Sequence, residues 1–280
     1  MTYFPTSLVD ILQYRAKEQP DQLAYRYLVD GEYDEVVMTY RELDSRACSI
    51  AALLQSFAKA GDRALLIFPP GLDFIAAFFG CLYAKILAVP VYPPHPARLE
   101  KNLSNILRVA ADAKPAVVLL TSSLYDVIKS RKEIADDLGN IRLLATDNDD
   151  LNDWKDGWQQ HEIKRSDLAF LQYTSGSTSA PRGVMINHGN LLHNLDLIGK
   201  CFGVSGESHA VNWLPPYHDM GLIGGILQPL YSGFPITLLP HMMFLQRPFR
   251  WLQTISRYHA TISGGPNFAY DLCVKKIKPE

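Results

Sequence analysis

The sequence has few cysteines, and they lack the spacing of a metal site or a disulfide framework. Four occur in 280 residues, and none forms a CxxC pair: Cys48, Cys81, Cys201 and Cys273. Each lies in an apolar stretch, so we expect buried thiols rather than disulfides or a zinc cluster. The N-terminal segment MTYFPTSLVDILQYR also lacks the basic start and long apolar core of a signal peptide. These features predict a cytoplasmic protein.

The sequence also lacks an excess of either charge and a long apolar run. There are 27 basic and 29 acidic residues, which excludes a general attraction to nucleic acid or to an anionic membrane surface. The most apolar stretch, 72–90, contains Asp73 and Lys85, and the segment between them is too short to cross roughly 30 Å of hydrocarbon. We therefore predict no nucleic-acid partner and no membrane span, and a bound polyanion would need a local site.

No internal repeat of fixed period and no low-complexity tract occurs, and the 48% of hydrophobic residues suffices for the core of one large or two modest domains. From about residue 63, short apolar runs alternate with longer amphipathic segments such as 98–113 and 122–137. The runs are 64–68, 86–91, 116–120, 141–145 and 168–171. This alternation predicts an α/β protein with mainly parallel sheets flanked by helices.

A second series of strands and helices is expected in the C-terminal part. Its strand and helix pairs are 184–187 with 189–200, 210–214 with 219–231, and 235–239 with 247–258; a strand at 261–262 then leads into a last helix. Near the N-terminus, Asp30-Gly31 predicts a hairpin turn, and the T-x-x-E pattern of Thr39 to Glu42 predicts the start of a helix. Residues 147–156, rich in Asp, Asn and Trp, predict an exposed connection.

The segment LQYTSGSTSAPRGV, residues 171–184, places small polar residues directly behind an apolar run. A Gly, Ser and Thr loop after a strand can direct backbone amides and hydroxyls toward one anion, and Arg182 adds a permanent cation. The Walker A spacing is not met, because six residues, not four, separate Gly176 from Gly183, and Arg182 precedes the second glycine. A G-x-S-x-G nucleophile elbow is absent as well. Two interpretations remain, a phosphate-binding loop and a solvated turn between two strands.

The order of residues in this segment resembles the phosphate-binding signature of the acyl-adenylate-forming superfamily, with Arg182 where most members carry lysine. Four further stretches resemble fatty acyl-AMP ligases more closely than generic acyl-CoA synthetases: FPPGLDFIAAFFGCLYA (68–84), AVPVYPP (88–94), WLPPYHDMGLIGG (213–225) and SGGPNFAYDLC (263–273). The resemblance covers essentially the whole chain.

It implies that residues 1–280 form an incomplete N-terminal AMP-binding domain. We expect about 60–187 to form a first α/β subdomain with the phosphate loop, and about 1–59 plus 188–280 to form a second. The family's small C-terminal lid domain, which carries its catalytic lysine, is not in this sequence.

The resemblance also implies the roles of individual residues. The phosphates of a nucleotide would be bound by Thr174, Ser175, Gly176, Ser177, Thr178, Arg182 and Gly183. His218 would lie beside the carboxylate that is adenylated. The acyl chain would be lined by Tyr217, Met220, Gly221, Ile223, Gly264, Gly265, Asn267 and Phe268. Without the resemblance, Asp219 is equally well a helix N-cap, His218 an ordinary turn residue and the apolar positions core. No metal-ligand spacing occurs, so we expect only Mg²⁺ carried with ATP.

The implied function is ATP-dependent activation of a fatty acid to acyl-AMP with release of pyrophosphate, for transfer to an acyl carrier protein or to a carrier domain of a polyketide or peptide synthase. One alternative is a fatty acyl-CoA ligase, which shares the first step. An alternative of another class is a non-catalytic fragment that binds lipid or nucleotide. Because the lysine of the lid is missing, we expect weak or no turnover from residues 1–280 alone.

Overall fold

The computed structural model describes residues 4–94, 99–130, 139, 141–174 and 181–277. Its internal contacts divide the chain into two units. The first comprises Met1–Asp10, Leu43–Pro69 and Asp73–Leu191, and the second Ile11–Glu42, Pro70–Leu72 and Leu192–Glu280. We expected residues 43–59 in the second subdomain, but they group with the first unit. Two contacts hold them there. Asp44 accepts from the Tyr83 hydroxyl at 2.5 Å, and Arg46 pairs with Asp73 at 2.6 Å. The assignment of the two units as subdomains of a family fold stays a prediction.

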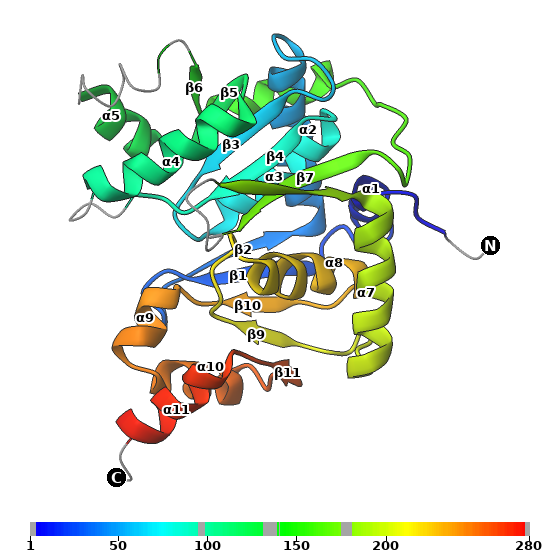
Figure 1. Ribbon diagram of the computed structural model, residues 1–280. Helices are drawn as coiled ribbons and strands as arrows, with labels where there is room; N and C mark the ends of the chain where they lie inside the picture. Colours follow the sequence, from blue (N-terminus) through cyan, green and yellow to red (C-terminus); the bar gives the residue numbers. More distant parts are fainter. Residues whose placement is uncertain (1–3, 95–98, 131–138, 140, 175–180, 278–280) are drawn as a thin grey trace. The chain divides into compact units, whose positions relative to one another are not determined.

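Among the described residues of the first unit, six strands form one sheet in the order β6-β5-β3-β4-β7-β8 (Figure 1). Their bounds are β3 Arg63–Ile67, β4 Leu87–Val91, β5 Val117–Leu120, β6 Arg142–Ala145, β7 Leu168–Thr174 and β8 Arg182–Asn187. Neighbouring strands are parallel except β7 and β8, which form an antiparallel hairpin. All four residues of β5 are buried, as expected for a strand with helices on both faces. The predicted mainly parallel α/β architecture is confirmed.

Helices cover both faces of this sheet. They are α2 Tyr40–Gln55, α3 Leu72–Tyr83, α4 Leu99–Ala113 and α5 Ser122–Ser130, with a 3₁₀ segment, η2, at Asp149–Gly157. On one face, Ile106 and Val109 of α4 and Ile128 of α5 pack against apolar residues of β3, β4 and β5. On the other face α3 packs on the sheet, with the Phe78 ring 5.6 Å from the Phe170 ring of β7 (Figure 1). Of the expected helix at 122–137, residues 131–137 lie outside the described residues.

In the second unit, five strands of the described residues form a sheet in the order β11-β9-β10-β1-β2. Their bounds are β1 Leu23–Leu28, β2 Glu35–Thr39, β9 Ala210–Asn212, β10 Ile236–Leu238 and β11 Ile262–Ser263. Only β1 and β2 pair antiparallel. The predicted turn between them is confirmed: Gly31 has φ +75°, and Asp30 accepts hydrogen bonds from three following backbone amides.

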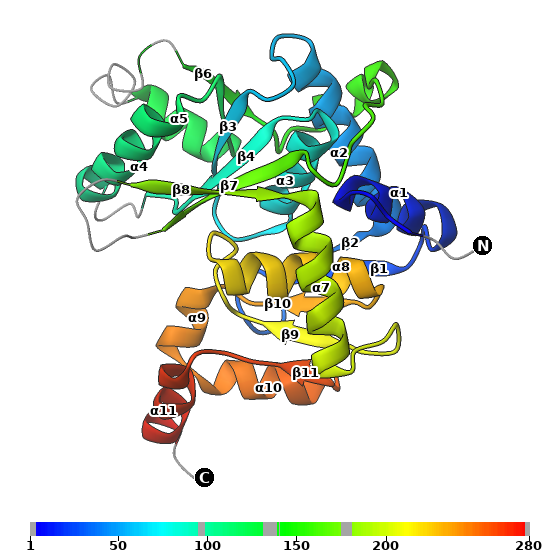
Figure 2. The ribbon, with the colours of Figure 1, turned by 45° about the vertical axis from the view of Figure 1, so that its right-hand side comes forward.

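The remaining helices are α1 Leu8–Glu18, α7 His188–Phe202, η3 Met220–Leu227, α8 Gln228–Ser232, α9 His241–Gln246, α10 Phe249–Arg257 and α11 Asn267–Lys276. Two expectations change. The helix expected at 219–231 is a π-helix, η3, followed by α8. The strand expected at 184–187 closes the first sheet as β8, beside β7 (Figure 2), so the second series begins with α7.

The four cysteines are free thiols, but not all are buried. Cys81 and Cys273 are buried, Cys48 is half-buried, and Cys201 is exposed. The prediction of a buried thiol is therefore wrong for Cys201, which lies on the solvent side of α7, whereas Leu191 and Leu195 of the same helix lie in the core. Within the described residues, no helix combines the length and the apolarity needed to cross a membrane.

Candidate functional site

The β7–β8 hairpin carries the predicted phosphate loop. Thr174 ends β7 and Arg182 begins β8, and the two residues are paired opposite each other in the ladder. Both are exposed, and Arg182 has no ion-pair partner among the residues that the structure describes. The four predicted residues between them, Ser175, Gly176, Ser177 and Thr178, lie outside the described residues. The Thr174 hydroxyl and the Arg182 guanidinium thus lie on paired residues at the mouth of the loop.

The base of this hairpin is held by Tyr173 and Gly183, which face each other in the ladder. A Cβ atom added to Gly183 would lie 2.9 Å from Cζ of the Tyr173 ring, so only glycine leaves room for the ring. The Tyr173 hydroxyl donates to Oδ2 of Asp112 on α4 at 2.5 Å. Burial, together with the neighbouring Asp112 carboxylate, raises the pKa of Tyr173, so the hydroxyl keeps the proton it donates. This contact ties the hairpin to α4. Sequence reasoning missed it, because Asp112 is far away along the chain and no local pattern marks the pair.

His218 and Asp219 lie in the turn between β9 and η3. Nδ1 of His218 is 2.7 Å from Oδ1 of Asp219, and the same oxygen accepts from the backbone amide of Met220 at 2.7 Å. Asp219 is thus the N-cap of η3, the alternative that residue chemistry alone left open. When Nδ1 of the neutral ring donates to Asp219, Nε2 is left as a hydrogen-bond acceptor. The His218 side chain is 64% exposed, so Nε2 is accessible to a ligand.

The π-helix η3 places its backbone unusually close to the preceding segment. A Cβ atom on Gly221 would lie 2.0 Å from the carbonyl oxygen of Pro215, and one on Gly225 would lie 1.8 Å from Nδ2 of Asn212. The amide of Gln228 donates to the carbonyl of Ile223, the i to i−5 bond of a π-helix. π-Turns occur often at functional sites. Close packing therefore explains why residue 221 is a glycine, independently of any role toward an acyl chain.

The predicted acyl-lining residues fall into two groups. The first follows β9 and comprises Tyr217, Met220, Gly221 and Ile223; the second follows β11 and comprises Gly264, Gly265, Asn267 and Phe268. Because β9 and β11 are parallel neighbours, both groups follow the carboxyl ends of adjacent strands, where open α/β sheets place ligands. Tyr217 and Gly221 are buried, Ile223 is half-buried, and Met220 and Phe268 are 49% and 51% exposed. Asn267 begins α11, as expected.

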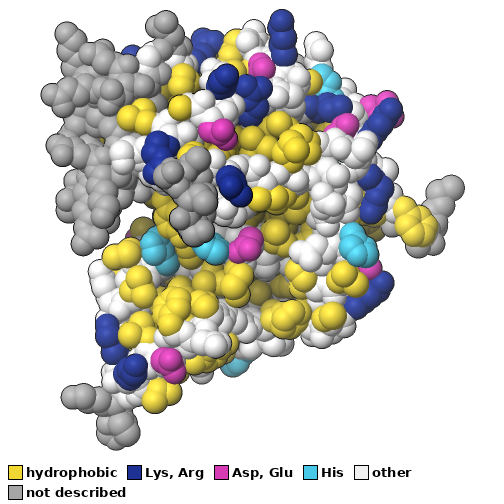
Figure 3. Space-filling view, in the orientation of Figure 1, with side chains coloured by type: hydrophobic (Ala, Val, Ile, Leu, Met, Phe, Trp, Pro, Cys, Tyr) yellow, Lys and Arg dark blue, Asp and Glu magenta, His cyan; other side chains and the backbone are white. Residues whose placement is uncertain are grey.

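Trp213 supports the second group, and sequence reasoning did not single it out. Its ring meets the Phe268 ring edge-on with 6.0 Å between centroids, and a Cβ atom on Gly265 would lie 3.1 Å from its Cζ2. It also stacks on Phe244 of α9 at 3.9 Å. Figure 3 shows hydrophobic side chains gathered on this face over C-terminal elements of the second unit. Phe268 and Tyr270 are each 51% exposed. The only sequence feature that could have pointed to Trp213 is its position as a tryptophan directly after β9.

Two cavities of the first unit are lined by other residues than those predicted. One of about 190 Å³ lies between α2, α3 and the segment after β6, and one of about 360 Å³ lies beside α5 and β6. In the part of the chain that the structure describes, no three or more His, Cys, Asp or Glu side chains are placed to hold a metal ion.

Comparison with known proteins matches this arrangement to one family. The family described as AMP-binding enzyme matches residues 12–280. The medium-chain-fatty-acid–[acyl-carrier-protein] ligase JamA of Moorena producens (strain JHB) is 43% identical over 276 residues, which cover 98% of this chain and 46% of JamA. The ligase of the same description from Teredinibacter turnerae, TtuA, is 32% identical, covering 97% of this chain and 48% of TtuA.

Solved structures agree with the sequence relatives. The fatty acyl-adenylate ligase from L. pneumophila, solved in complex with acyl adenylate and pyrophosphate, is 46% identical with a TM-score of 0.89; the match covers 97% of this chain and 46% of that protein. The chain thus spans about half the length of the relatives it matches.

Proposed function

This chain belongs to the AMP-binding enzyme family, and on that premise we propose that it is the N-terminal domain of a fatty acyl-AMP ligase. The protein would activate a fatty acid with ATP to acyl-AMP and pass the acyl group to a carrier protein or carrier domain. The observation that carries this proposal is the 46% identity to a ligase whose structure contains both acyl adenylate and pyrophosphate. The exposed Thr174 and Arg182 at the mouth of the β7–β8 loop support it.

In the proposed reaction, a carboxylate oxygen of the fatty acid attacks the α-phosphorus of ATP. The bond from this phosphorus to the oxygen that bridges to the β-phosphate breaks, and pyrophosphate leaves with that electron pair. Thr174, the loop residues 175–178 and Arg182 would hold the β- and γ-phosphates and stabilise the charge that develops on them. Hydrogen bonds to charged oxygens contribute about 1.5–3 kcal/mol each, so a few can bind a triphosphate without help from the overall charge.

His218 would orient the carboxylate. A carboxylate only accepts hydrogen bonds, so His218 would act in its doubly protonated form, with Nδ1–H donating to Asp219 and Nε2–H donating to the fatty-acid carboxylate. The two groups of residues after β9 and β11 would line the acyl chain, and each buried methylene would contribute roughly 0.8 kcal/mol. Mg²⁺ bound to ATP would neutralise part of the phosphate charge. Because the described residues offer no cluster of three ligands, we assign it no protein ligand set.

The acceptor separates two candidate functions. JamA and TtuA are ligases to an acyl carrier protein, whereas a 36% identical mycobacterial relative, FadD21, is a putative fatty-acid–CoA ligase. We favour a carrier protein because the 43% identity to JamA exceeds the identity to FadD21. We also propose a cytoplasmic location, which the free thiols support.

The test is made on the full-length protein. Arg182→Ala should slow acyl-AMP formation from ATP and a medium-chain fatty acid at least tenfold, while Arg165→Ala, a second exposed arginine of the first unit, should leave the rate within about twofold. An unchanged rate in Arg182→Ala, or equal losses in both variants, would remove the phosphate role. Offering CoA and a phosphopantetheinylated carrier protein in turn then identifies the acceptor.

A further inference from the structure

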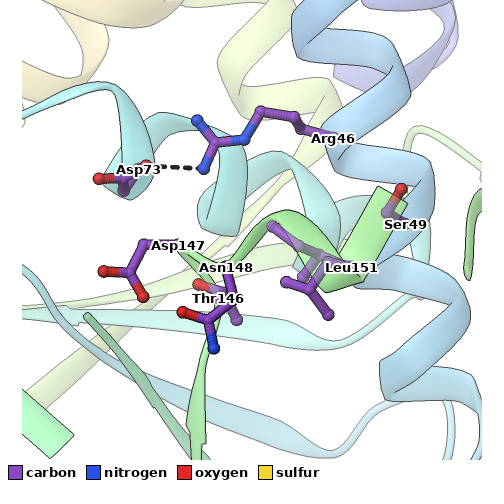
Figure 4. A pocket seen from close by; sticks show the side chains of 8 residues that line it. Arg46, Ser49, Asp73, Thr146, Asp147, Asn148 and Leu151 are labelled. Atoms are coloured by element: carbon purple, nitrogen blue, oxygen red, sulfur yellow. Dashed lines mark hydrogen bonds and ion pairs between the residues drawn. The ribbon is translucent and has the colours of Figure 1, made fainter. Parts of the chain in front are cut away.

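The cavity of about 190 Å³ in the first unit is lined mainly by polar and charged side chains (Figure 4). It is lined by Arg46, Ser49 and Ile50 of α2, by Asp73 of α3, and by Thr146, Asp147, Asn148 and Leu151 after β6. We expected 147–156 to be an exposed connection, and for Asp147 that expectation is wrong. Thr146, which precedes that segment, is only 1% exposed, and Asp147 is half-buried, with its carboxylate bound by Ser122 at the start of α5.

The cavity lies at the edge of the sheet where ligands bind in open α/β proteins. Thr146 directly follows the carboxyl end of β6, and Asp73 lies in the first turn of the helix that follows β3. Strands β3, β5 and β6 are parallel, so these ends meet at the same edge. In the sheet, β6 is the strand farthest from β8. The cavity is therefore separate from the hairpin that carries Thr174 and Arg182.

Its charges do not balance. Nη2 of Arg46 lies 2.6 Å from Oδ1 of Asp73, so these two charges neutralise each other. Oδ1 of Asp147 accepts from the amide of Ser122 at 2.8 Å and lies 2.7 Å from the Ser122 hydroxyl, whose single proton is shared with Oδ1 of Asn148. Within the described residues Asp147 pairs with no basic side chain. The lining therefore carries one uncompensated negative charge, on a carboxylate that is held by Ser122.

The hydroxyl groups of the lining leave acceptors for a ligand. Ser49 donates its only hydroxyl proton to the carbonyl of Ser45 at 3.0 Å, so its buried oxygen can only accept a further bond. Oγ1 of Thr146 is buried and has no hydrogen-bond partner among the described residues. Buried polar atoms are nearly always paired, so an unpaired one at a cavity wall indicates a missing partner.

We propose that this cavity binds the primary ammonium group of a small organic amine. An ammonium group supplies one positive charge and three N–H donors. The charge matches the Asp147 carboxylate, and the donors match a wall that offers acceptors. Neutral diols lack the charge, and quaternary ammonium ions lack the donors. The cavity volume limits the ligand to a few heavy atoms.

The test uses ethanolamine as the probe, measured by chemical-shift titration of the folded 280-residue chain at constant ionic strength. Saturable binding with a dissociation constant in the millimolar range is expected for a ligand of so few heavy atoms. Ethylene glycol, of the same size without the charge, and tetramethylammonium, with the charge but no N–H donor, should bind at least tenfold more weakly.

Two variants locate the site. Asp147→Asn removes the charge but keeps an oxygen to accept from Ser122, and Thr146→Val removes the hydroxyl at almost unchanged shape. Each should weaken ethanolamine binding about tenfold, the effect of losing one charge-assisted hydrogen bond. Asp150→Asn makes the same charge change on the exposed η2 segment outside the lining, and should change binding less than twofold.

Thr146→Val also distinguishes ligand binding from folding, because removing an unpaired buried hydroxyl should leave the unfolding midpoint of the ligand-free chain unchanged or raised. Three results would each overturn the proposal: no saturation by ethanolamine, equal binding of either control compound, or equal effects of Asp147→Asn and Asp150→Asn. None of these measurements depends on ATP, so the proposal stands or falls independently of acyl-AMP formation.

Discussion

The two candidate segments, one in each unit, are held in place by different means. The β7–β8 hairpin is tied to α4 by a side-chain contact, from the Tyr173 hydroxyl to Asp112. The turn that carries His218 is held by close backbone packing, since Gly221 of η3 lies against the carbonyl of Pro215. A side-chain tether can be weakened in steps, whereas a backbone contact leaves no space for even one added carbon. The phosphate hairpin should therefore tolerate substitution better than the His218 turn.

The largest effect is expected at the backbone contact. Gly221→Ala places a carbon 2.0 Å from a carbonyl oxygen, and should lower the free energy of unfolding by about 3 kcal/mol. Gly224→Ala is the matched control, because a Cβ at Gly224, in the same π-helix, meets nothing within 4 Å. Alanine there should be neutral or stabilise by about 0.5 kcal/mol. Urea unfolding measures both, and equal effects would refute the packing argument.

His188, where β8 passes into α7, should make the free energy of unfolding depend on pH by up to about 3 kcal/mol. His188 is 2% exposed, and its Nδ1 accepts from the amide of Leu8 at 3.2 Å. Burial lowers the pKa of His188 to about 4 from the ordinary 6.5. The unfolded chain therefore binds a proton that the folded chain does not, so this stability is fully present above pH 6.5 and is lost as the pH falls toward 4.

The backbone contact of η3 contains no titratable group, so acid should loosen the hairpin end of the first unit and spare that contact. Unfolding free energies measured between pH 7 and 4 check this. His188→Gln keeps a hydrogen-bond acceptor without the titration, and should flatten the slope in this window. An unchanged slope would show that other groups cause the acid sensitivity.

The smallest effect is expected at the side-chain tether. Tyr173→Phe removes the hydrogen bond to Asp112, and should cost about 1 kcal/mol because the exposed Asp112 can bind water instead. Combined with Asp112→Ala in a double-mutant cycle, the two losses should not add. If the tether also positions Thr174, the affinity for ATP should fall a few-fold in Tyr173→Phe. Additive losses would show that the contact contributes nothing as a pair.

Much of the fold could be predicted from local patterns. The apolar runs became strands, and the Asp30-Gly31 turn and the start of α11 at Asn267 lie where the sequence indicated. The pairing of β8 with β7 could not be predicted, because a strand of this length carries no signal for its partner. The π-helix also escaped prediction, since its extra residue per turn depends on how Gly221 and Gly225 fit their neighbours.

The candidate site shows the same division. Residue types indicated a loop at Thr174 and Arg182 and a turn at His218. The structure has Thr174 and Arg182 at the ends of β7 and β8, and His218 in the turn between β9 and η3. The contacts that support them, Tyr173 with Asp112 and Trp213 with Phe268, join residues far apart in the chain and left no local trace. Asp147 was misassigned to an exposed connection for a related reason, because Ser122, which binds its carboxylate, lies 25 residues earlier in the chain.

The central claim is that the β7–β8 loop binds the phosphates of ATP. A crystal of the chain soaked with ATP and Mg²⁺ tests it most directly. The account predicts the β- and γ-phosphate oxygens within hydrogen-bond distance of the Thr174 hydroxyl and the Arg182 guanidinium. A triphosphate bound elsewhere, with both side chains left in solvent, would contradict it.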